Sequence, residues 1–255
     1  MSDEALLLDV GNTRVKWGLF ADGRITRTGS VERLRLNESG FGLLTTKLPR
    51  RLNGVVISNV TGAAFSARLS GVFSLYCDSN VHFVQSERET LGLKSSYAQP
   101  RKLGVDRWMA MLGARSEVKG SFCSVDAGTA VTIDVVDGSG THLGGQIMPG
   151  LALMNRVLEC DTGKITPCSR LSRRSARNLP TLGKSTRTAV SIGTLNAVCG
   201  AVERTLRKMR AERLRPKIIL TGGDAPYLLK QLDGDILHRP HLVLQGLALI
   251  WRDRL

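Results

Sequence analysis

Short apolar runs and turn residues succeed one another along this chain, and the same succession occurs twice. In the first half, the apolar residues 6–8 lead into a polar turn at residues 9–13, after which residues 14–20 alternate between apolar and polar. In the second half, residues 122–125 lead into a turn at 126–130, and an alternating segment follows at 131–136. Alternation with a period of two is typical of half-buried strands. Each half is therefore predicted to begin with a strand, a turn and a second strand.

The later segments of the two halves also correspond. A hairpin turn and a third strand are expected at residues 24–28 in the first half and at 142–147 in the second. A short strand with three consecutive apolar residues, expected to be buried, follows in each half, at residues 55–58 and 218–221. The second of these strands runs into Gly222-Gly223-Asp224, a further turn that leaves backbone exposed. Because order and turn chemistry both recur, we expect two similar α/β domains.

The remaining segments predict helices and one long loop. Helices are expected at residues 59–75, 108–119, 150–159, 185–213 and 242–251. Residues 160–184 are rich in Ser, Arg, Thr, Pro and Gly and are expected to form a mobile loop or lid. No low-complexity linker separates the halves. We place the domain boundary after the apolar helix that precedes the second set of strands, giving domains 1–117 and 118–255.

The two strand-to-turn junctions carry the candidate chemistry. Each delivers an aspartate, Asp9 or Asp126, into a turn that contains glycine and threonine. Such a turn combines a carboxylate for a hydrated cation, uncovered backbone N–H groups and a hydroxyl or amide. Asp-x-Gly is common in ordinary turns. Two of them at equivalent positions favour a nucleotide-phosphate site.

Composition restricts the class of protein further. The chain has 255 residues, of which 42% are hydrophobic, and no segment approaches the roughly 20 apolar residues that span a bilayer. The acidic start is unlike a secretory signal. Five cysteines without a C-x-x-C pair suggest neither a disulfide framework nor a zinc knuckle. We expect a cytoplasmic protein with reduced thiols and no membrane association.

A net charge of +14 is less ordinary. Part of the excess lies at residues 204–217 and part at 170–177. Such charge favours anionic partners, either nucleotide or nucleic acid. The alternative is a solvated, arginine-rich surface, which fits the scarcity of aromatic residues among the arginines and the lack of any DNA-reading motif. We therefore expect no specific nucleic-acid binding.

Between the two turns, the segment Gly104-Val105-Asp106-Arg107 places a carboxylate and a guanidinium side by side at a predicted helix start. Asp106 could accept a proton from a substrate hydroxyl, and Arg107 could bind an anionic or polar part of that substrate. The pair could also be a helix-capping aspartate followed by a solvated arginine. Its position just before the second phosphate turn favours an acceptor-binding role.

Several segments together resemble one enzyme family. They are 9–17 (DVGNTRVKW), 104–107 (GVDR), 126–134 (DAGTAVTID), 144–150 (GGQIMPG), 183–193 (GKSTRTAVSIG) and 221–224 (TGGD). In order and spacing they resemble the type III pantothenate kinases over nearly the whole chain. The resemblance implies two ribonuclease H-like domains of the acetate/sugar kinase, Hsc70 and actin architecture. It also implies transfer of phosphate from ATP to pantothenate, the first step of coenzyme A biosynthesis.

The resemblance implies roles for individual residues. Asp106 would be the general base, and Asp126 would hold a monovalent cation, potassium or ammonium, besides the magnesium that accompanies ATP. Residues that would bind ATP are Asp9, Val10, Gly11, Asn12, Thr13, Arg14, Val15, Lys16 and Thr129. Residues that would bind pantothenate are Tyr97, Gly104, Val105, Asp106, Arg107 and Thr186. The family resemblance further implies a homodimer with pantothenate near the interface.

Two other functions compete with this interpretation. The Bvg accessory factor proteins share these motifs and are associated with transcription, so that a regulatory, nucleotide-binding role is the main alternative. A non-catalytic nucleotide-binding module is the other. The presence of both Asp106 and Asp126 favours a working kinase.

Overall fold

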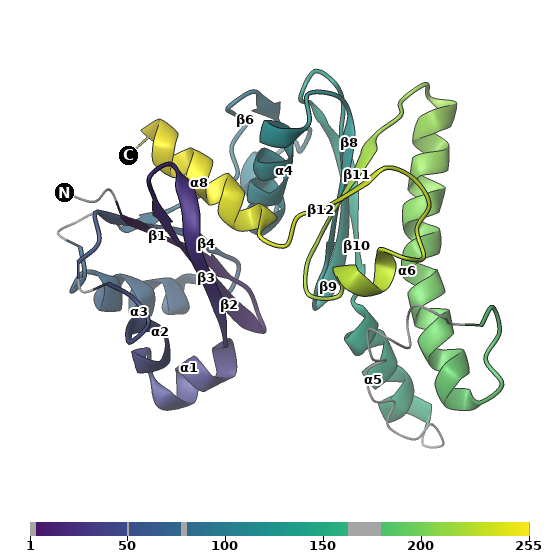
Figure 1. The fold of residues 1–255 in the computed structure, drawn as a ribbon, viewed down its shortest axis with the longest axis horizontal. Helices are drawn as coiled ribbons and strands as arrows, with labels where there is room; N and C mark the ends of the chain where they lie inside the picture. The colour runs from purple at the N-terminus through teal and green to yellow at the C-terminus, as the bar shows by residue number, and fades with distance from the viewer. Residues whose placement is uncertain (1–3, 50, 78–80, 163–179, 255) are drawn as a thin grey trace. The chain divides into compact units, whose positions relative to one another are not determined.

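The computed structural model describes residues 4–49, 51–77, 81–162 and 180–254, and it divides into two compact units (Figure 1). The first unit comprises Met1–Glu117 and Leu242–Leu255, and the second comprises Val118–His241. The C-terminal helix α8 (Leu242–Arg254) thus belongs to the first unit. The predicted second domain, residues 118–255, is wrong at its C-terminal end for this reason.

The first unit is built on a five-stranded sheet in the order β3-β2-β1-β4-β5. β2 lies antiparallel to both β1 and β3, whereas β4 runs parallel to β1 and to β5. Every residue of β1 is buried, as expected for a central strand covered on both faces. The bounds are β1 Ala5–Val10, β2 Arg14–Ala21, β3 Arg24–Glu32, β4 Gly54–Asn59 and β5 Val81–Phe83. The four strands predicted for this half are confirmed.

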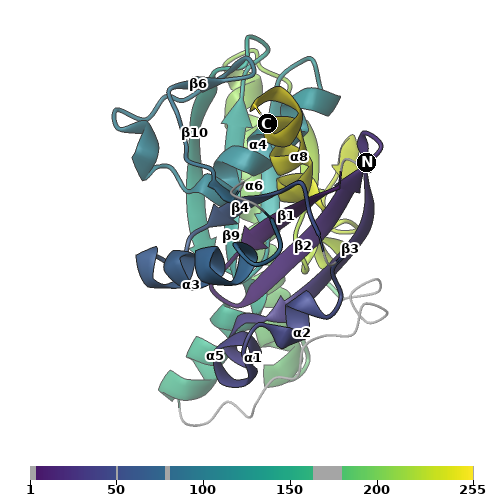
Figure 2. The same ribbon diagram turned by 90° about the vertical axis from the view of Figure 1, so that its left-hand side faces the viewer.

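Helices cover both faces of this sheet (Figure 2). α1 (Arg33–Ser39), α2 (Gly42–Thr45) and α3 (Ala63–Phe73) bury Leu36, Leu44 and Leu69 in one hydrophobic cluster with alternate residues of β1, β2 and β4. α4 (Val105–Glu117) and α8 pack against the other face. A small hairpin, β6 (Glu89–Thr90) and β7 (Leu93–Lys94), and a 3-10 turn at Pro100–Lys102 precede α4.

Two glycines bring α4 and α8 into backbone contact. A Cβ atom on Gly246 of α8 would overlap the carbonyl oxygen of Met109, and one on Gly113 of α4 would overlap the carbonyl oxygen of Leu242. Gln245 also donates a hydrogen bond of 3.1 Å to the carboxylate of Glu117 at the end of α4. Because neither helix can accept a side chain at the crossing, the C-terminal helix is an integral part of the support for α4.

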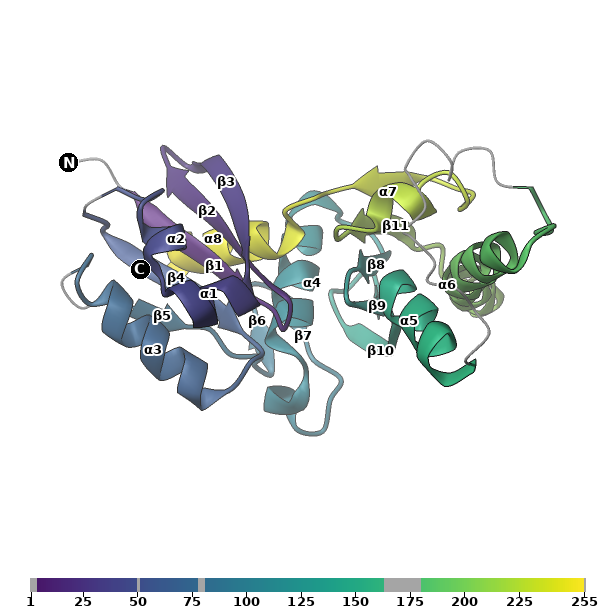
Figure 3. The ribbon, with the colours of Figure 1, turned by 90° about the horizontal axis from the view of Figure 1, so that it is seen from below.

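The second unit repeats the sheet of the first, with the order β10-β9-β8-β11-β12. Its hydrophobic cluster lies on one face, between alternate residues of the strands and the helices α5 (Leu151–Thr162), α6 (Thr186–Ala211) and α7 (Ala225–Leu228). Figure 3 shows α5 and α6 along the same side of this sheet. The bounds are β8 Phe122–Ala127, β9 Ala130–Val136, β10 His142–Pro149, β11 Lys217–Thr221 and β12 Ile236–His238. The predicted duplication is confirmed by the matching strand orders.

The longest helix starts at a well-defined cap. Ser185 accepts a hydrogen bond from the N–H of Thr188, and the Thr188 side chain accepts one from the N–H of Ser185. This capping box explains why α6 begins where the sequence predicts. Of the predicted loop at residues 160–184, residues 163–179 lie outside the described ones, and residues 160–162 belong to α5. Within the described residues, no helix has the length and apolar character needed to cross a membrane.

Candidate functional site

The first predicted phosphate turn, residues 9–13, connects β1 to β2 at the carboxyl end of β1. The N–H of Gly11 donates to the carbonyl of Arg14 at 3.0 Å, which closes the turn and leaves Asn12 and Thr13 exposed. Asp9 is 7% exposed, and its Oδ2 lies 3.7 Å from Nζ of Lys16, the residue opposite it on β2. A carboxylate and an ammonium group therefore lie beside exposed backbone.

Not every residue predicted to bind ATP presents a side chain at this turn. Val10 and Val15 are fully buried in the hydrophobic cluster of the first unit. Arg14 is exposed, but its guanidinium donates to Ser30 at 2.7 Å and lies 3.8 Å from Glu32. Only the backbone of the two valines can take part in binding. Their side chains fasten the turn to the core.

The second phosphate turn connects β8 to β9 in the second unit. The N–H of Gly128 donates to the carbonyl of Ala130 at 3.0 Å, and Thr129 is exposed. The carbonyl of Thr129 accepts from the N–H of Gly150 at 2.9 Å, just before α5 begins. Asp126 is partly exposed on β8, two residues before Gly128. The turn thus combines a carboxylate, a hydroxyl and backbone fixed by its neighbours.

The segment Gly222-Gly223-Asp224 lies directly against this second turn. β11 runs parallel to β8 with Thr221 opposite Asp126, and the N–H of Asp224 donates to the carbonyl of Ala127 at 2.8 Å. Gly222 has φ +96°, and a Cβ atom there would overlap Oδ1 of Asp126 and the carbonyl oxygen of Ala127. Glycine is required at this position for both reasons. Because Gly222 has no side chain, its backbone can lie close to the Asp126 carboxylate.

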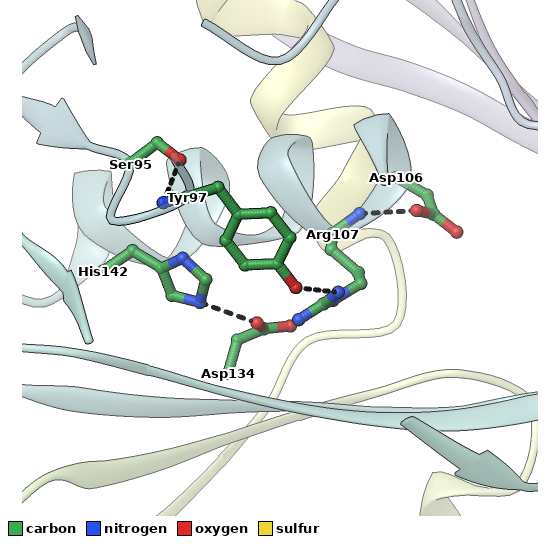
Figure 4. Close-up of polar contacts among 6 residues, drawn as sticks. All are labelled: Ser95, Tyr97, Asp106, Arg107, Asp134 and His142. Atoms are coloured by element: carbon green, nitrogen blue, oxygen red, sulfur yellow. Dashed lines mark hydrogen bonds and ion pairs between the residues drawn. The ribbon is translucent and has the colours of Figure 1, made fainter. Parts of the chain in front are cut away.

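The predicted acceptor-binding segment, residues 104–107, lies at the start of α4 in the first unit (Figure 4). Asp106 is in the first helical turn, and its Oδ1 accepts from the N–H of Arg107 at 2.8 Å. A Cβ atom on Gly104 would lie 2.7 Å from this same oxygen, so glycine there leaves room for the carboxylate. Arg107 is only 6% exposed, contrary to the alternative of a solvated arginine.

Arg107 reaches Tyr97, which comes from the loop after β7. Its Nη1 donates to the tyrosine hydroxyl at 3.2 Å, and its guanidinium carbon lies 5.9 Å from the ring centroid. The loop is fastened by Arg88, which donates to the carbonyls of Tyr97 and Ala98 at 3.1 and 3.2 Å. Ser95 Oγ also accepts from the N–H of Tyr97 at 3.3 Å (Figure 4). The structure thus brings Tyr97 and Arg107 together. The role of Arg88 was not predicted, because no motif includes this residue.

Thr186, the remaining predicted pantothenate-binding residue, is exposed at the first position of α6 in the second unit. It is not the helix cap, because Ser185 holds that position. No described contact joins Thr186 to another predicted site residue of its own unit, so its role stays a prediction.

A pocket lies beside the second turn and was not predicted. It has empty space of about 350 Å³, part of it open solvent, and lies among α5, α6 and α7. Asp224, 1% exposed, follows Gly222-Gly223, and Oδ1 of the buried Asn155 has no hydrogen-bond partner among the described residues. The lining residues are Leu151, Ala152, Asn155, Ser191, Thr194, Leu195, Asp224 and Tyr227. Only the Gly-Gly-Asp turn could have indicated this pocket from the sequence, since the other residues meet through tertiary packing.

The sequence also did not predict a buried pair of polar side chains on the second sheet. His142 and Asp134 are 0% and 2% exposed, and Nε2 of His142 lies 2.9 Å from Oδ1 of Asp134 (Figure 4). Cys123 is buried near this carboxylate. Burial, with a smaller contribution from Asp134, raises the pKa of the Cys123 thiol to about 12. This cysteine therefore stays protonated and is unsuited to nucleophilic chemistry.

The oxygen atoms around the two turns indicate which metal ions could bind there. Across the described ranges, no group of three or more His, Cys, Asp or Glu side chains could hold a metal ion. The second turn instead offers one carboxylate, Asp126, among backbone oxygens, and the first turn offers Asp9 beside exposed backbone. Oxygen donors suit hard cations, and magnesium is commonly held by one or two carboxylates together with substrate phosphates. The chemistry fits cations that arrive with a nucleotide rather than a permanent metal cage.

Comparisons with solved structures establish the fold class. The structure of a putative Baf family transcriptional activator from Campylobacter jejuni superimposes with a TM-score of 0.62 at 21% identity, covering 97% of this chain and 98% of the other. A glucokinase from Balamuthia mandrillaris in complex with glucose gives a TM-score of 0.55 at 11% identity, covering 98% and 94%. At these identities the likeness concerns the fold alone. It confirms the predicted sugar kinase, Hsc70 and actin architecture.

Sequence relatives establish the family. The family model for type III pantothenate kinase matches residues 5–208. A type III pantothenate kinase from Nitrosococcus oceani is 32% identical over 257 residues, which cover 97% of this chain and 94% of the relative. With a matching family model over most of its length and a relative of this similarity, the chain belongs to the type III pantothenate kinase family.

Proposed function

We propose that the chain transfers phosphate from ATP to the primary hydroxyl of pantothenate, with Asp106 as the general base, giving 4'-phosphopantothenate. The start of α4 is the observation that carries this proposal. It holds the Asp106 carboxylate by a local hydrogen bond to the N–H of Arg107, and it holds the Arg107 guanidinium, nearly buried, against Tyr97. A carboxylate within reach of the hydroxyl can accept its proton as the phosphorus–oxygen bond forms. This reaction is the first step of coenzyme A biosynthesis, and we place the protein in the cytoplasm.

Pantothenate offers a carboxylate at one end and the reacting hydroxyl at the other. Arg107 binds polar or anionic atoms of the acceptor, and its contact with Tyr97 restricts the direction in which its donors point. The backbone of Gly104 and Val105 contributes further contacts. In the homodimer proposed below, the hydroxyl of Thr186 contacts the pantothenate of the partner chain. In this arrangement the arginine orients the acceptor, and the adjacent aspartate removes the proton.

Each of the two turns offers groups that bind phosphate oxygens. In the first turn these groups are the exposed backbone at residues 11–14 and the Lys16 ammonium, which lies 3.7 Å from Asp9. The Thr129 hydroxyl and the Gly128 backbone act from the second turn. Phosphoryl transfer depends on positioning and on neutralising charge, which magnesium bound with the nucleotide also supplies.

The pocket lined by Asn155, Asp224 and Tyr227 receives the nucleoside. Two of its lining residues, Leu151 and Asp224, lie next to the second phosphate turn. Leu151 follows Gly150, whose N–H donates to the carbonyl of Thr129, and the N–H of Asp224 donates to the carbonyl of Ala127. The pocket and the second phosphate turn are therefore joined by backbone hydrogen bonds. Apolar walls with a few buried polar atoms are typical of sites for planar rings with amino groups.

Asp126 binds a monovalent cation, for which potassium and ammonium are the expected ions. We expect activity in potassium or ammonium buffers and much less in sodium alone, because the smaller sodium ion prefers shorter oxygen distances. Replacing Asp126 with alanine should lower activity by at least about 10- to 100-fold, the usual loss on removing a metal-site partner. ATP-dependent phosphorylation of pantothenate, measured in each salt, tests both the reaction and the cation site.

The control is Asp233→Ala, which removes an exposed carboxylate elsewhere in the second unit. It should leave turnover and salt dependence unchanged. Equal rates in sodium and potassium would contradict the cation assignment, and no phosphorylation of pantothenate in any salt would contradict the proposed function.

The chain is further proposed to act as a homodimer. Strand β10 lies at the edge of its sheet, and Ile147 on it is 65% exposed. Leu143 and, on α5, Val157 are also exposed, at 43% and 49%. Exposed apolar groups along the edge strand of a sheet are typical of an interaction surface. This surface supports association of two copies through the second unit.

Analytical ultracentrifugation should accordingly give about twice the chain mass of 27.7 kDa at micromolar concentration. Ile147→Asp should shift the protein toward the monomer, because a buried, unpaired charge at an interface costs several kcal/mol. Leu75→Asp is the matched control, since Leu75 is 82% exposed in the first unit. A wild-type protein that sediments as a monomer would refute the dimer.

A further inference from the structure

Arg33 donates two hydrogen bonds to the first phosphate turn and belongs to none of the motifs described above. Arg33 is the first residue of α1, immediately after β3. Its side-chain Nε donates to the carbonyl of Asn12 at 2.7 Å, and its backbone N–H donates to the carbonyl of Thr13 at 2.9 Å. One residue therefore binds two consecutive carbonyl groups at the tip of the turn.

These two hydrogen bonds orient the N–H groups of the turn. A peptide unit is planar and trans, so its C=O and N–H point in opposite directions. The carbonyl of Asn12 shares a peptide unit with the N–H of Thr13, and the carbonyl of Thr13 shares one with the N–H of Arg14. When Arg33 holds both carbonyls, both N–H groups are directed away from α1. Exposed N–H groups that point the same way are the donors that bind phosphate oxygens in such turns.

Arg33 lies on the opposite side of the sheet from the charged residues of the site. Val31, two residues earlier, packs in the hydrophobic cluster with Phe65 of α3, and the guanidinium carbon of Arg33 lies 5.9 Å from the Phe65 ring centroid. Asp9 alternates with Leu8 and Val10, which belong to that cluster, and so points to the other side. Arg33 therefore contacts the back of the turn, away from Asp9.

The Phe65 ring, which lies against the Arg33 guanidinium, is itself held in place by neighbouring side chains. The guanidinium of Arg68 lies 5.6 Å from the Phe65 ring and 5.2 Å from the Phe41 ring, and the two ring centroids are 5.7 Å apart. Arg68 in turn donates to Asn37 of α1 at 2.8 Å. Stacked guanidinium and aromatic groups of this kind stabilise one another. Arg33 thus connects the α1–α3 side of the first unit to the phosphate turn.

We propose that Arg33 is a positioning residue for phosphoryl transfer, which holds the Asn12–Thr13 peptide units so that their N–H groups face the phosphates of ATP. This inference rests on the proposed function, because it assigns the first turn to ATP. Arg33 acts through the turn backbone and touches neither substrate. Its loss should therefore impair the use of ATP and leave KM for pantothenate unchanged.

The test compares three variants by steady-state kinetics with each substrate varied in turn. Arg33→Met removes the donor, Arg33→Gln keeps an N–H donor without the charge, and Arg35→Met removes a charge from an exposed position on the same helix. We expect kcat/KM for ATP to fall about 10- to 100-fold in Arg33→Met, as for a lost charge-assisted hydrogen bond that misplaces a reacting group. Arg33→Gln should recover part of this loss. Arg35→Met should behave as wild type, and KM for pantothenate should stay constant throughout.

Two results would overturn the inference: equal kinetics of Arg33→Met and Arg35→Met, or equal losses in Arg33→Gln and Arg33→Met, which would indicate charge rather than the hydrogen bond. If Arg33→Met does not fold, Arg33→Gln is compared with Arg35→Gln, and a defect confined to ATP is still required. A wild-type protein that does not phosphorylate pantothenate would refute the proposed function. An active wild type with normal Arg33 variants would refute only the positioning role.

Discussion

Replacing Asp106 with asparagine should lower kcat by about two to four orders of magnitude, the usual contribution of a general base. Asparagine keeps an oxygen that can accept the hydrogen bond from the N–H of Arg107, so the start of α4 should stay intact. Binding of ATP should be nearly unchanged, because the proposed role of Asp106 is to take the proton of the acceptor hydroxyl and not to bind phosphate. Single-turnover rates and ATP titration of the purified variant would separate the two effects.

A matched control is available at the other end of the same helix. Glu117→Gln also removes a carboxylate from α4, but at an exposed position. Its turnover should stay within about twofold of wild type, as is usual for surface substitutions. Turnover near the wild-type value in Asp106→Asn would show that Asp106 is not the base.

The second large effect is expected at Gly222. Alanine there would have to adopt φ +96° and would overlap the Asp126 carboxylate and the Ala127 carbonyl. The strained backbone alone costs about 1–3 kcal/mol of unfolding free energy, and relief of the overlap displaces the second phosphate turn. We therefore expect a lower melting temperature together with a loss of most activity, measured by thermal denaturation and by the pantothenate phosphorylation assay.

The neighbouring residue supplies the comparison. A Cβ atom on Gly223 would meet nothing within 4 Å, and its φ lies outside the left-handed region. Gly223→Ala should therefore retain stability and activity. Similar behaviour of the two variants would mean that the close approach to Asp126 has no functional consequence.

The strands and turns could be predicted from the sequence because their signals are local. Alternating residues in 14–20 and 131–136 and the Asp-x-Gly turns before them correspond to β2, β9 and the junctions that precede them. α1 and the short edge strands β5 and β12 were missed. These segments are too short for a periodic pattern, and tertiary contacts decide their conformation.

The site was predictable to a similar extent. Gly104, Asp106 and Arg107 are adjacent in sequence, so that their joint role could be inferred from one segment. Arg88 supports the Tyr97 loop, and Arg33 supports the first turn, through hydrogen bonds. These bonds join residues that are 9 to 21 positions apart in the sequence. Nothing in the chemistry of an arginine indicates which distant carbonyl it will bind. Positioning residues of this kind become visible only in the folded structure.

The glycine contact between α4 and α8 has a consequence for the order of folding during synthesis. Ribosomes release a chain from its N-terminus, and N-terminal domains generally fold first. Here α8 (Leu242–Arg254), which packs against one face of the first sheet, is synthesised after the whole of the second unit, Val118–His241. The first unit therefore cannot be completed before the second unit has been synthesised, and its β1–β4 surface depends on other protection until α8 has emerged.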